Sequence, residues 1–399
     1  IHRCLVQRAA RNSHRVGPDW ATIRGAFEGF SWAIHLQQDI GVGVFSTLVE
    51  QSDRLEKRLG RKIVVRRILV RDLDKPRPVD IHMRQLTTTP ADVLEAADID
   101  VVVELIGGIE PARGYMEAAL RNGKHLVTAN KDVMANYGVE LLRLAGERGL
   151  DLFFEASVGG GIPLIGPFRQ DLAANEITEI HAIINGTTNY ILTRMAYEHT
   201  DFNQALAEAQ QQGFAESDPT NDVEGFDAVY KLSILASLAF HQRVSPDGIY
   251  RQGIANLQPQ DFRYAQELGY AIKSLAVATL EQNDIRARVY PALVPVDHML
   301  AKVDGVYNAV EVTGSLCGQV LFHGRGAGKG PTTSAVMGDL IEIPLVDNLE
   351  PAPDGGTRFG WGKGTLYTEN KGHGKINAKR KDKTERKIIN DEKVRKSRK

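Results

Sequence analysis

The stretch of the chain best suited to chemistry is residues 213–231, where acidic side chains and one amine recur at close spacing. Glu216 and Asp222 lie on either side of Pro219, among other turn-forming residues, and this composition predicts a loop. A loop of this kind can present carboxylates to a bound molecule or to a neighbouring side chain.

The sequence after Gly225 predicts a helix that carries the remaining two charged groups. Asp227 and Lys231 are four residues apart, so they share one helix face near its N-terminus. With the two loop acids, three carboxylates and one amine converge in a small volume. Such a cluster is typical either of an acid–base site for a charged substrate or of a solvated helix start. In the second case its ion pair contributes less than about 1 kcal/mol.

The elements before residue 156 alternate between short apolar runs and amphipathic helices. This alternation predicts a Rossmann-like, doubly wound parallel sheet of the dinucleotide-binding class. The predicted strands are 63–70, 99–106, 125–128 and 152–155, and the predicted helices are 42–59, 110–121 and 133–148.

Residues 156–323 have a different pattern and predict an inserted α+β substrate and dimerisation domain. The predicted strands are 177–184, 286–293, 307–313 and 318–322, and the predicted helices are 190–199, 202–212 and 225–240. A helix over 334–341 returns the chain to the first domain. We therefore divide the chain into an aberrant or disordered N-terminus (1–35), a dinucleotide-binding domain (36–155 plus 324–345), a catalytic domain (156–323) and a disordered basic tail (346–399).

Several further motifs accompany the acid–amine cluster. They are Glu104-Leu105-Ile106-Gly107-Gly108, Thr128-Ala129-Asn130-Lys131, Glu155 to Pro163, Asn185-Gly186-Thr187-Thr188-Asn189 and Gly324-Arg325-Gly326-Ala327-Gly328. Together with Ala209, Gly213, Asp218-Pro219, Asp222, Gly225, Asp227 and Lys231, this ordered pattern resembles the homoserine dehydrogenase family from about Ile40 to Ile343. The resemblance implies NAD(P)-dependent interconversion of L-aspartate 4-semialdehyde and L-homoserine.

The resemblance also implies roles for the charged side chains. Lys231 is the catalytic lysine, because an ammonium near the aldehyde oxygen can stabilise a developing alkoxide and supply a proton. Asp227 positions the substrate and this lysine, and Lys131 lies near the nicotinamide and the substrate. Glu216 accepts the amino group of the substrate, and Asp222 supports the same network.

Cofactor contacts are implied along both ends of the resemblance. The implied residues are Gly41, Gly107, Thr128, Lys131, Gly213, Gly326 and Gly328. Arg71 and Lys75 follow a predicted strand and suit the 2′-phosphate of NADP, whereas Asp72 suits the ribose hydroxyls of NAD. The basic residues favour NADP weakly.

A structural sodium ion is implied near the end of the first domain. In the family its ligands correspond to carbonyls of Val158, Gly160 and Ile162 with a contact from Glu155, and hard cations prefer such oxygen ligands. The structural alternative is a glycine-rich turn between a strand and a loop.

The chain departs from the family at both ends. Leu36 and Gln38 occupy positions where a dinucleotide loop carries glycine, and residues 31–35 form a poor strand pattern. This departure supports an alternative, a catalytically impaired homologue that cannot bind the dinucleotide. The abrupt change at each end favours a shifted reading frame or an annotation error over a divergent paralogue, so we expect residues 1–35 and 350–399 to be poorly ordered.

Charge and cysteine content limit the function classes further. The net charge is −1, but residues 371–399 hold thirteen Lys or Arg and four Asp or Glu, a local charge of +9. A basic tail raises the hypothesis of a nucleic-acid anchor, although we predict no nucleic-acid partner. Neither Cys4 nor Cys317 has the context of a nucleophile for acyl-level oxidation.

The remaining predictions concern the setting of the protein. No apolar run approaches the roughly 20 residues that span a bilayer, and no signal-peptide core is present. A first residue of Ile1 instead of Met favours a missing or mis-assigned beginning. We expect a cytoplasmic enzyme with a small-molecule substrate, no membrane association, and a homodimeric or homotetrameric assembly.

Overall fold

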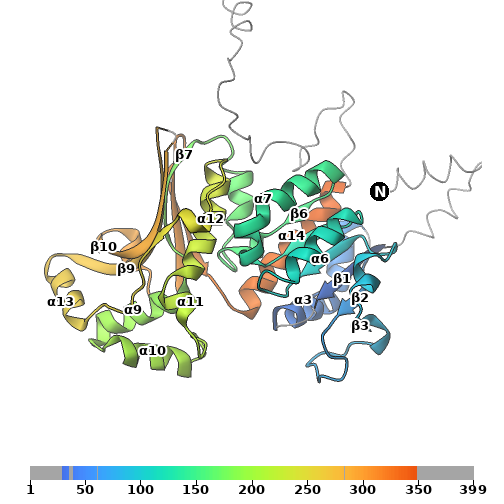
Figure 1. Cartoon of the computed structure of the whole chain (residues 1–399), viewed down its shortest axis with the longest axis horizontal. Helices are drawn as coiled ribbons and strands as arrows, with labels where there is room; N and C mark the ends of the chain where they lie inside the picture. Colours follow the sequence, from blue (N-terminus) through green and yellow to red (C-terminus); the bar gives the residue numbers. More distant parts are fainter. Residues whose placement is uncertain (1–28, 36–38, 61, 283, 348–399) are drawn as a thin grey trace, which may run out of the picture. The chain divides into compact units, whose positions relative to one another are not determined.

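A computed structural model describes residues 29–35, 39–60, 62–282 and 284–347, which contain two six-stranded sheets with their helices (Figure 1). The predictions for residues 1–28, for Leu36 and Gln38, and for 348–399 lie outside the described residues. Within the described part of the chain, no helix has both the length and the apolar character that crossing a membrane requires.

The first sheet is entirely parallel and has the strand order β3-β2-β1-β4-β5-β6. Its strands are β1 (Gly29–His35), β2 (Lys62–Leu69), β3 (Leu86–Thr87), β4 (Val101–Glu104), β5 (His125–Thr128) and β6 (Leu152–Phe153). Its helices are α3 (Asp39–Glu50), α4 (Ser52–Leu59), α5 (Ala91–Leu94), α6 (Ala112–Arg121), α7 (Lys131–Arg148) and α14 (Lys329–Asp347), with the short turn η1 (Met83–Gln85). The strand order reverses between β1 and β4, as in a doubly wound dinucleotide-binding fold, so the predicted fold class is confirmed.

The boundaries of the first domain differ from the predictions at two points. Residues 31–35 were expected to be a poor strand within an aberrant or disordered N-terminus (1–35), yet Gly29–His35 form β1 and pair with both β2 and β4. Strand pairing is made by main-chain hydrogen bonds, which do not depend on the side-chain pattern. A segment paired on both sides can therefore form a strand although its sequence pattern predicts one poorly. At the other end α14 extends to Asp347, two residues into the predicted tail.

The second sheet has the order β12-β11-β7-β9-β10-β8 and is antiparallel except where β8 meets β10. Its strands are β7 (Ile177–Ile183), β8 (Tyr250–Arg251), β9 (Tyr270–Glu281), β10 (Asp284–Pro295), β11 (Tyr307–Gly314) and β12 (Gly318–Arg325). The accompanying helices are α8 (Ile165–Arg169), α9 (Gly186–Glu198), α10 (Phe202–Gln211), α11 (Thr220–Val223), α12 (Phe226–Ala239) and α13 (Pro259–Glu267). Short 3-10 helices η3 (Pro246–Gly248) and η4 (Met299–Lys302) accompany it, and η2 (Glu155–Ser157) lies against β5 and α14 of the first domain.

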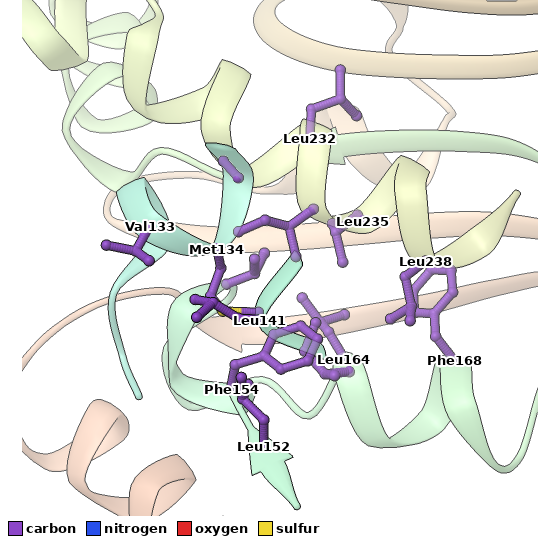
Figure 2. Close-up of a cluster of buried hydrophobic side chains, with 14 of the residues drawn as sticks. Val133, Met134, Leu141, Leu152, Phe154, Leu164, Phe168, Leu232, Leu235 and Leu238 are labelled. Atoms are coloured by element: carbon purple, nitrogen blue, oxygen red, sulfur yellow. The ribbon is translucent and has the colours of Figure 1, made fainter. Parts of the chain in front are cut away.

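A continuous apolar core joins α7 of the first domain to α12 of the second (Figure 2). Leu232, Leu235 and Leu238 of α12 belong to one buried cluster with Met134 and Leu141 of α7, and Leu238 lies beside Phe168. Each buried aliphatic side chain contributes about 1.5–3 kcal/mol, so this core fixes the two helices relative to each other. Residues at the start of α7 are therefore held close to residues at the start of α12.

Glycines in α3 and α7 allow a test of how closely α3 packs against α14. A Cβ atom at Gly43 of α3 would lie 2.3 Å from Thr333 Oγ1 of α14, whereas a Cβ atom at Gly146 of α7 would meet nothing within 4 Å. We expect Gly43→Ala to lower the free energy of unfolding by about 1–3 kcal/mol through overpacking. Gly146→Ala should raise it by up to about 1 kcal/mol through helix propensity. Urea unfolding of both variants measures the difference, and equal effects would contradict the close α3–α14 contact.

Candidate functional site

The centre of the site is Asp227, which accepts hydrogen bonds from two lysines on different elements. Lys231 Nζ, one turn later on α12, lies 2.7 Å from Asp227 Oδ2. Lys131 Nζ, from the first residue of α7, lies 2.5 Å from Asp227 Oδ1. The side chain of Asp227 is only 5% exposed, and that of Lys231 is 11% exposed. The predicted acid–amine pair is therefore a buried cluster and not a solvated helix start.

The charges of this cluster stabilise one another. Burial alone would raise the pKa of Asp227, but the Lys231 and Lys131 ammonium groups outweigh it and hold that pKa well below its usual range. Burial would likewise lower the pKa of Lys131, yet the Asp227 carboxylate raises it above its ordinary value. Asp227 is thus ionised and Lys131 is positively charged at neutral pH.

Asn185, which the sequence analysis did not assign to the site, holds the two acids of the cluster together. Its Nδ2 donates to Asp222 Oδ1 at 2.6 Å and to Asp227 Oδ2 at 2.8 Å. Its Oδ1 accepts the backbone N–H of Thr188, so Asn185 is the N-cap of α9 and the orientation of its amide is fixed. An Asn before a Gly-Thr-Thr helix start is the N-cap signal by which it could have been found.

Two of the three N–H donors of Lys231 have partners among the described residues. Its Nζ donates to Asp227 Oδ2 and to the backbone carbonyl of Ile184, at 2.9 Å, which is the residue after strand β7. An ammonium group has three N–H donors, and these two partners fix its position. The third donor can therefore point to a substrate oxygen without rearrangement of the lysine.

The two loop acids occupy different environments. Burial raises the pKa of Asp222, although its hydrogen bond from Asn185 opposes this effect. Glu216 is exposed, and its carboxylate has no hydrogen bond or ion pair with the residues that the structure describes. Gln210 Nε2 donates to the backbone carbonyl of Glu216 at 3.0 Å and so holds the loop main chain. Among the described residues, the Glu216 carboxylate makes none of the hydrogen bonds of the Asp227 cluster and is open to solvent.

The start of α12 is shaped by a glycine and an arginine. Gly225 adopts a left-handed conformation with a φ of 84°, which reverses the chain between α11 and α12. The Arg251 guanidinium lies 3.5 Å from the centre of the Phe226 ring, and its Nη1 donates to the carbonyl of Glu224. These contacts fix the direction in which α12 begins and hence the position of Asp227.

The predicted cofactor residues of the first domain lie near the carboxyl ends of parallel strands, which share one edge of the sheet. Gly107 follows β4 with a φ of 79°. The Nδ2 of Asn130 donates to the backbone carbonyl of Gly108 at 2.8 Å. Thr128, at the end of β5, is fully buried and its Oγ1 donates to Glu104 Oε2 at 2.6 Å. Thr128 therefore fixes the position of the Glu104 carboxylate, and its hydroxyl hydrogen is donated to that carboxylate and not to a ligand.

The loop after β2 presents the predicted specificity residues. Arg71 and Lys75 are exposed. The Asp72 carboxylate accepts the backbone N–H of Asp74 at 2.9 Å, and Arg77 donates to the carbonyl of Lys75 at 2.9 Å. The Asp72 carboxylate is thus hydrogen-bonded to the loop backbone, whereas Arg71 and Lys75 are exposed to solvent.

The glycine-rich segment after β12 packs against the predicted cation loop. A Cβ atom at Gly160 would lie 2.5 Å from the carbonyl oxygen of Gly326, so only glycine fits this contact. Gly161 donates its backbone N–H to the carbonyl of Arg325 at 3.1 Å. Gly328 has a φ of 114° and precedes α14. Gly326 and Gly328 therefore belong to a loop held on the catalytic domain, whereas Gly41 lies buried in α3 and Gly213 lies exposed after α10.

The predicted sodium ligands are close in sequence and differ in how they are used. Both Glu155 carboxylate oxygens accept backbone N–H groups at the start of α8, from Leu164, Ile165 and Gly166 at 2.5–2.9 Å. The residues Val158, Gly160 and Ile162 are buried. Their carbonyl oxygens accept no hydrogen bond from the described part of the chain. Buried carbonyls without donors are suitable ligands for a hard cation.

A substitution at Asp227 tests the cluster. We expect Asp227→Asn to lower the free energy of unfolding by about 3–5 kcal/mol, because two lysines at a buried site lose their counter-charge. The control is Glu147→Gln, which removes the exposed i,i+4 pair with Arg143 and should change stability by less than about 1 kcal/mol. Urea unfolding compares the two, and a loss at Asp227 as small as the control would show that the pair does not stabilise the fold.

Comparisons with known proteins agree with this geometry. Residues 163–341 match the family model described as homoserine dehydrogenase, and residues 39–155 match the one described as homoserine dehydrogenase, NAD binding domain. The homoserine dehydrogenase of Bacillus subtilis is 43% identical, over 76% of this chain and 70% of that protein. The homoserine dehydrogenase of Synechocystis is 47% identical, over 76% and 71% of the two chains.

Solved structures give the same result. The crystal structure of a homoserine dehydrogenase from Thiobacillus denitrificans aligns with a TM-score of 0.77 and 43% identity, covering 81% of this chain and 75% of that one. A hyperthermophilic archaeal homoserine dehydrogenase mutant in complex with NADPH aligns with a TM-score of 0.66 and 27% identity, covering 79% and 98%. These comparisons do not support the alternative of an impaired homologue.

Proposed function

The chain belongs to the homoserine dehydrogenase family, and we propose that its Asp227 cluster interconverts L-aspartate 4-semialdehyde and L-homoserine. The observation that carries the proposal is the pair of lysine ammonium groups on one buried carboxylate. This reaction belongs to threonine, methionine and isoleucine biosynthesis. The site is suited to it because reduction of an aldehyde requires a proton at oxygen beside the carbon that is reduced.

Lys231 acts on the substrate oxygen. When bound, a nicotinamide dinucleotide supplies the hydride for the carbonyl carbon. Lys231, fixed by Asp227 and the carbonyl of Ile184, directs its third N–H to the aldehyde oxygen. It stabilises the developing negative charge and transfers a proton to the oxygen, and the reverse reaction returns that proton to the lysine. Lys131 keeps the cluster positively charged on the side of the dinucleotide-binding domain.

The substrate is a small zwitterion, and the loop acids suit its ammonium group. The exposed Glu216 carboxylate accepts this group, since it has no partner among the described residues. Asp222 is half-buried beside Asn185 and supports the same end of the substrate. An ionised acceptor gives a charge-assisted hydrogen bond, which is about twice as strong as a neutral one.

The first domain suits a nicotinamide dinucleotide, with NADP preferred. The left-handed glycine after β4, the reversal of strand order and the loop after β2 together form the site in which such folds hold the cofactor. Gly107, Lys131, Gly326 and Gly328 would border it, and Arg71 with Lys75 would hold a 2′-phosphate. The archaeal relative in complex with NADPH supports the choice.

Two further features belong to the proposal. A sodium ion held by the carbonyls of Val158, Gly160 and Ile162 beside Glu155 would be structural, and their lack of donors in the described region supports it. We also propose a homodimer or homotetramer, for which light scattering during size-exclusion chromatography gives the mass.

Removal of the catalytic amine tests the function. Lys231→Met should lower kcat for homoserine oxidation by about 10²–10⁴-fold, the usual contribution of a positioned acid–base group. Absorbance at 340 nm measures the rate. The matched control is Lys124→Met, because Lys124 is also buried and donates to two backbone carbonyls, Ala96 and Ile99, within the first domain. That control should lose stability and keep its kcat within a few-fold, and a Lys231→Met protein with parental kcat would refute the assignment.

Cofactor choice has its own test. Arg71→Ser should raise KM for NADPH by about tenfold or more, because a hydrogen bond to a charged group contributes about 1.5–3 kcal/mol. KM for NADH should stay unchanged, since NADH lacks the 2′-phosphate. Lys57→Ser, which removes another cation from a nearby helix, serves as the control for general electrostatics. Equal changes for the two cofactors would exclude Arg71 from phosphate recognition.

A further inference from the structure

Asn308 is a buried polar side chain that takes no part in the proposed reaction. It is the second residue of β11 and is 1% exposed. Neither its Nδ2 nor its Oδ1 has a hydrogen-bond partner among the described residues. A buried amide without partners lowers stability, because the desolvation of both groups is not offset.

The carboxamide of Asn308 lies between two glycines of the site. A Cβ atom at Gly326 would fall 1.8 Å from Asn308 Nδ2, and one at Gly186 would fall 3.6 Å from Asn308 Oδ1. Gly326 belongs to the loop 324–328, which we assign to the dinucleotide. Gly186 begins α9 directly after Asn185, the residue that holds Asp222 and Asp227. One side chain thus contacts both the cofactor loop and the base of the catalytic cluster.

A second buried asparagine, Asn189, has a structural role and serves as a comparison. Asn189, also 1% exposed, donates its Nδ2 to three backbone carbonyls, those of Val303, Gly305 and Tyr307. It fastens α9 to the segment before β11. Asn308 makes no such bond within the described chain, so its polarity does not stabilise the fold seen here. A leucine of similar shape would be expected to pack there more favourably.

We propose that Asn308 is a positioning residue whose carboxamide pairs with the backbone of loop 324–328 when a nicotinamide dinucleotide binds. The inference rests on the proposed function. A hydrogen bond that forms only with the bound cofactor favours the loop arrangement of that complex, and this difference in free energy strengthens binding. Asn308 also lies beside the start of α9, so the same side chain fixes the position of the loop relative to Asn185 and the Asp227 cluster.

The test compares Asn308→Leu with Asn189→Leu in the full chain. Asn308→Leu should raise the urea midpoint without cofactor and raise Kd for NADPH by about tenfold, which corresponds to one hydrogen bond of about 1.4 kcal/mol. Asn189→Leu should lower the urea midpoint and leave Kd for NADPH unchanged. Protein fluorescence during NADPH titration gives Kd, and kcat at saturating NADPH should fall less than Kd rises.

Asn308→Asp provides an independent variant. It keeps the shape of the side chain and removes the donor that faces Gly326, so Kd for NADPH should again rise. Parental Kd in both Asn308 variants, or a lower urea midpoint in Asn308→Leu, overturns the inference about Asn308 alone. Absence of saturable NADPH binding by the parent chain overturns the proposed function together with the inference.

Discussion

A single buried carboxylate, Asp227, is the electrostatic link between the two domains of this enzyme. An isolated buried charge is strongly unfavourable, so Asp227 is stable only while its ammonium partners are within hydrogen-bonding distance. One partner, Lys231, comes from the same helix and is supplied by local geometry. The other, Lys131, comes from the edge of the parallel sheet. The electrostatic requirement of one side chain therefore links the dinucleotide-binding domain to the helix that carries the proposed catalytic lysine.

Apolar packing makes that link possible. Leucines of α12 and side chains of α7 share one continuous core, and this packing brings the N-termini of the two helices close together (Figure 2). Gly225 and the contact of Arg251 with Phe226 then set the direction of α12. Burial of apolar side chains contributes most of the free energy that holds α7 against α12, because buried ion pairs contribute little net stability. The ion pairs instead fix the positions of the charged groups.

Local spacing in the sequence predicted the parts of the site that are themselves local. The Asp227–Lys231 pair follows from helical periodicity, and the alternating strands and helices predicted the doubly wound sheet. The bond between Lys131 and Asp227 joins residues 96 positions apart, and only the family resemblance placed them together. Asn185 was missed because its helix was predicted to begin at Tyr190, which hid the N-cap. The central strand β9 was missed because its apolar positions do not alternate cleanly with polar ones. The weak pattern of β1 was overridden by pairing on both sides.

The polar groups of the site fall into two sets, and this division matches the steps of the reaction. Asn185 and Lys231 both donate hydrogen bonds to Asp227, which fixes their positions, as the proposed proton transfer at a fixed oxygen requires. The side chains of Glu216 and Asn308 have no hydrogen-bond partners among the described residues, and we propose that each recognises a different ligand. Unpaired groups can discriminate between ligands, since a molecule that fails to satisfy them leaves their desolvation uncompensated. Catalysis is thus assigned to groups that are already paired, and selectivity to groups that only the correct substrate and cofactor complete.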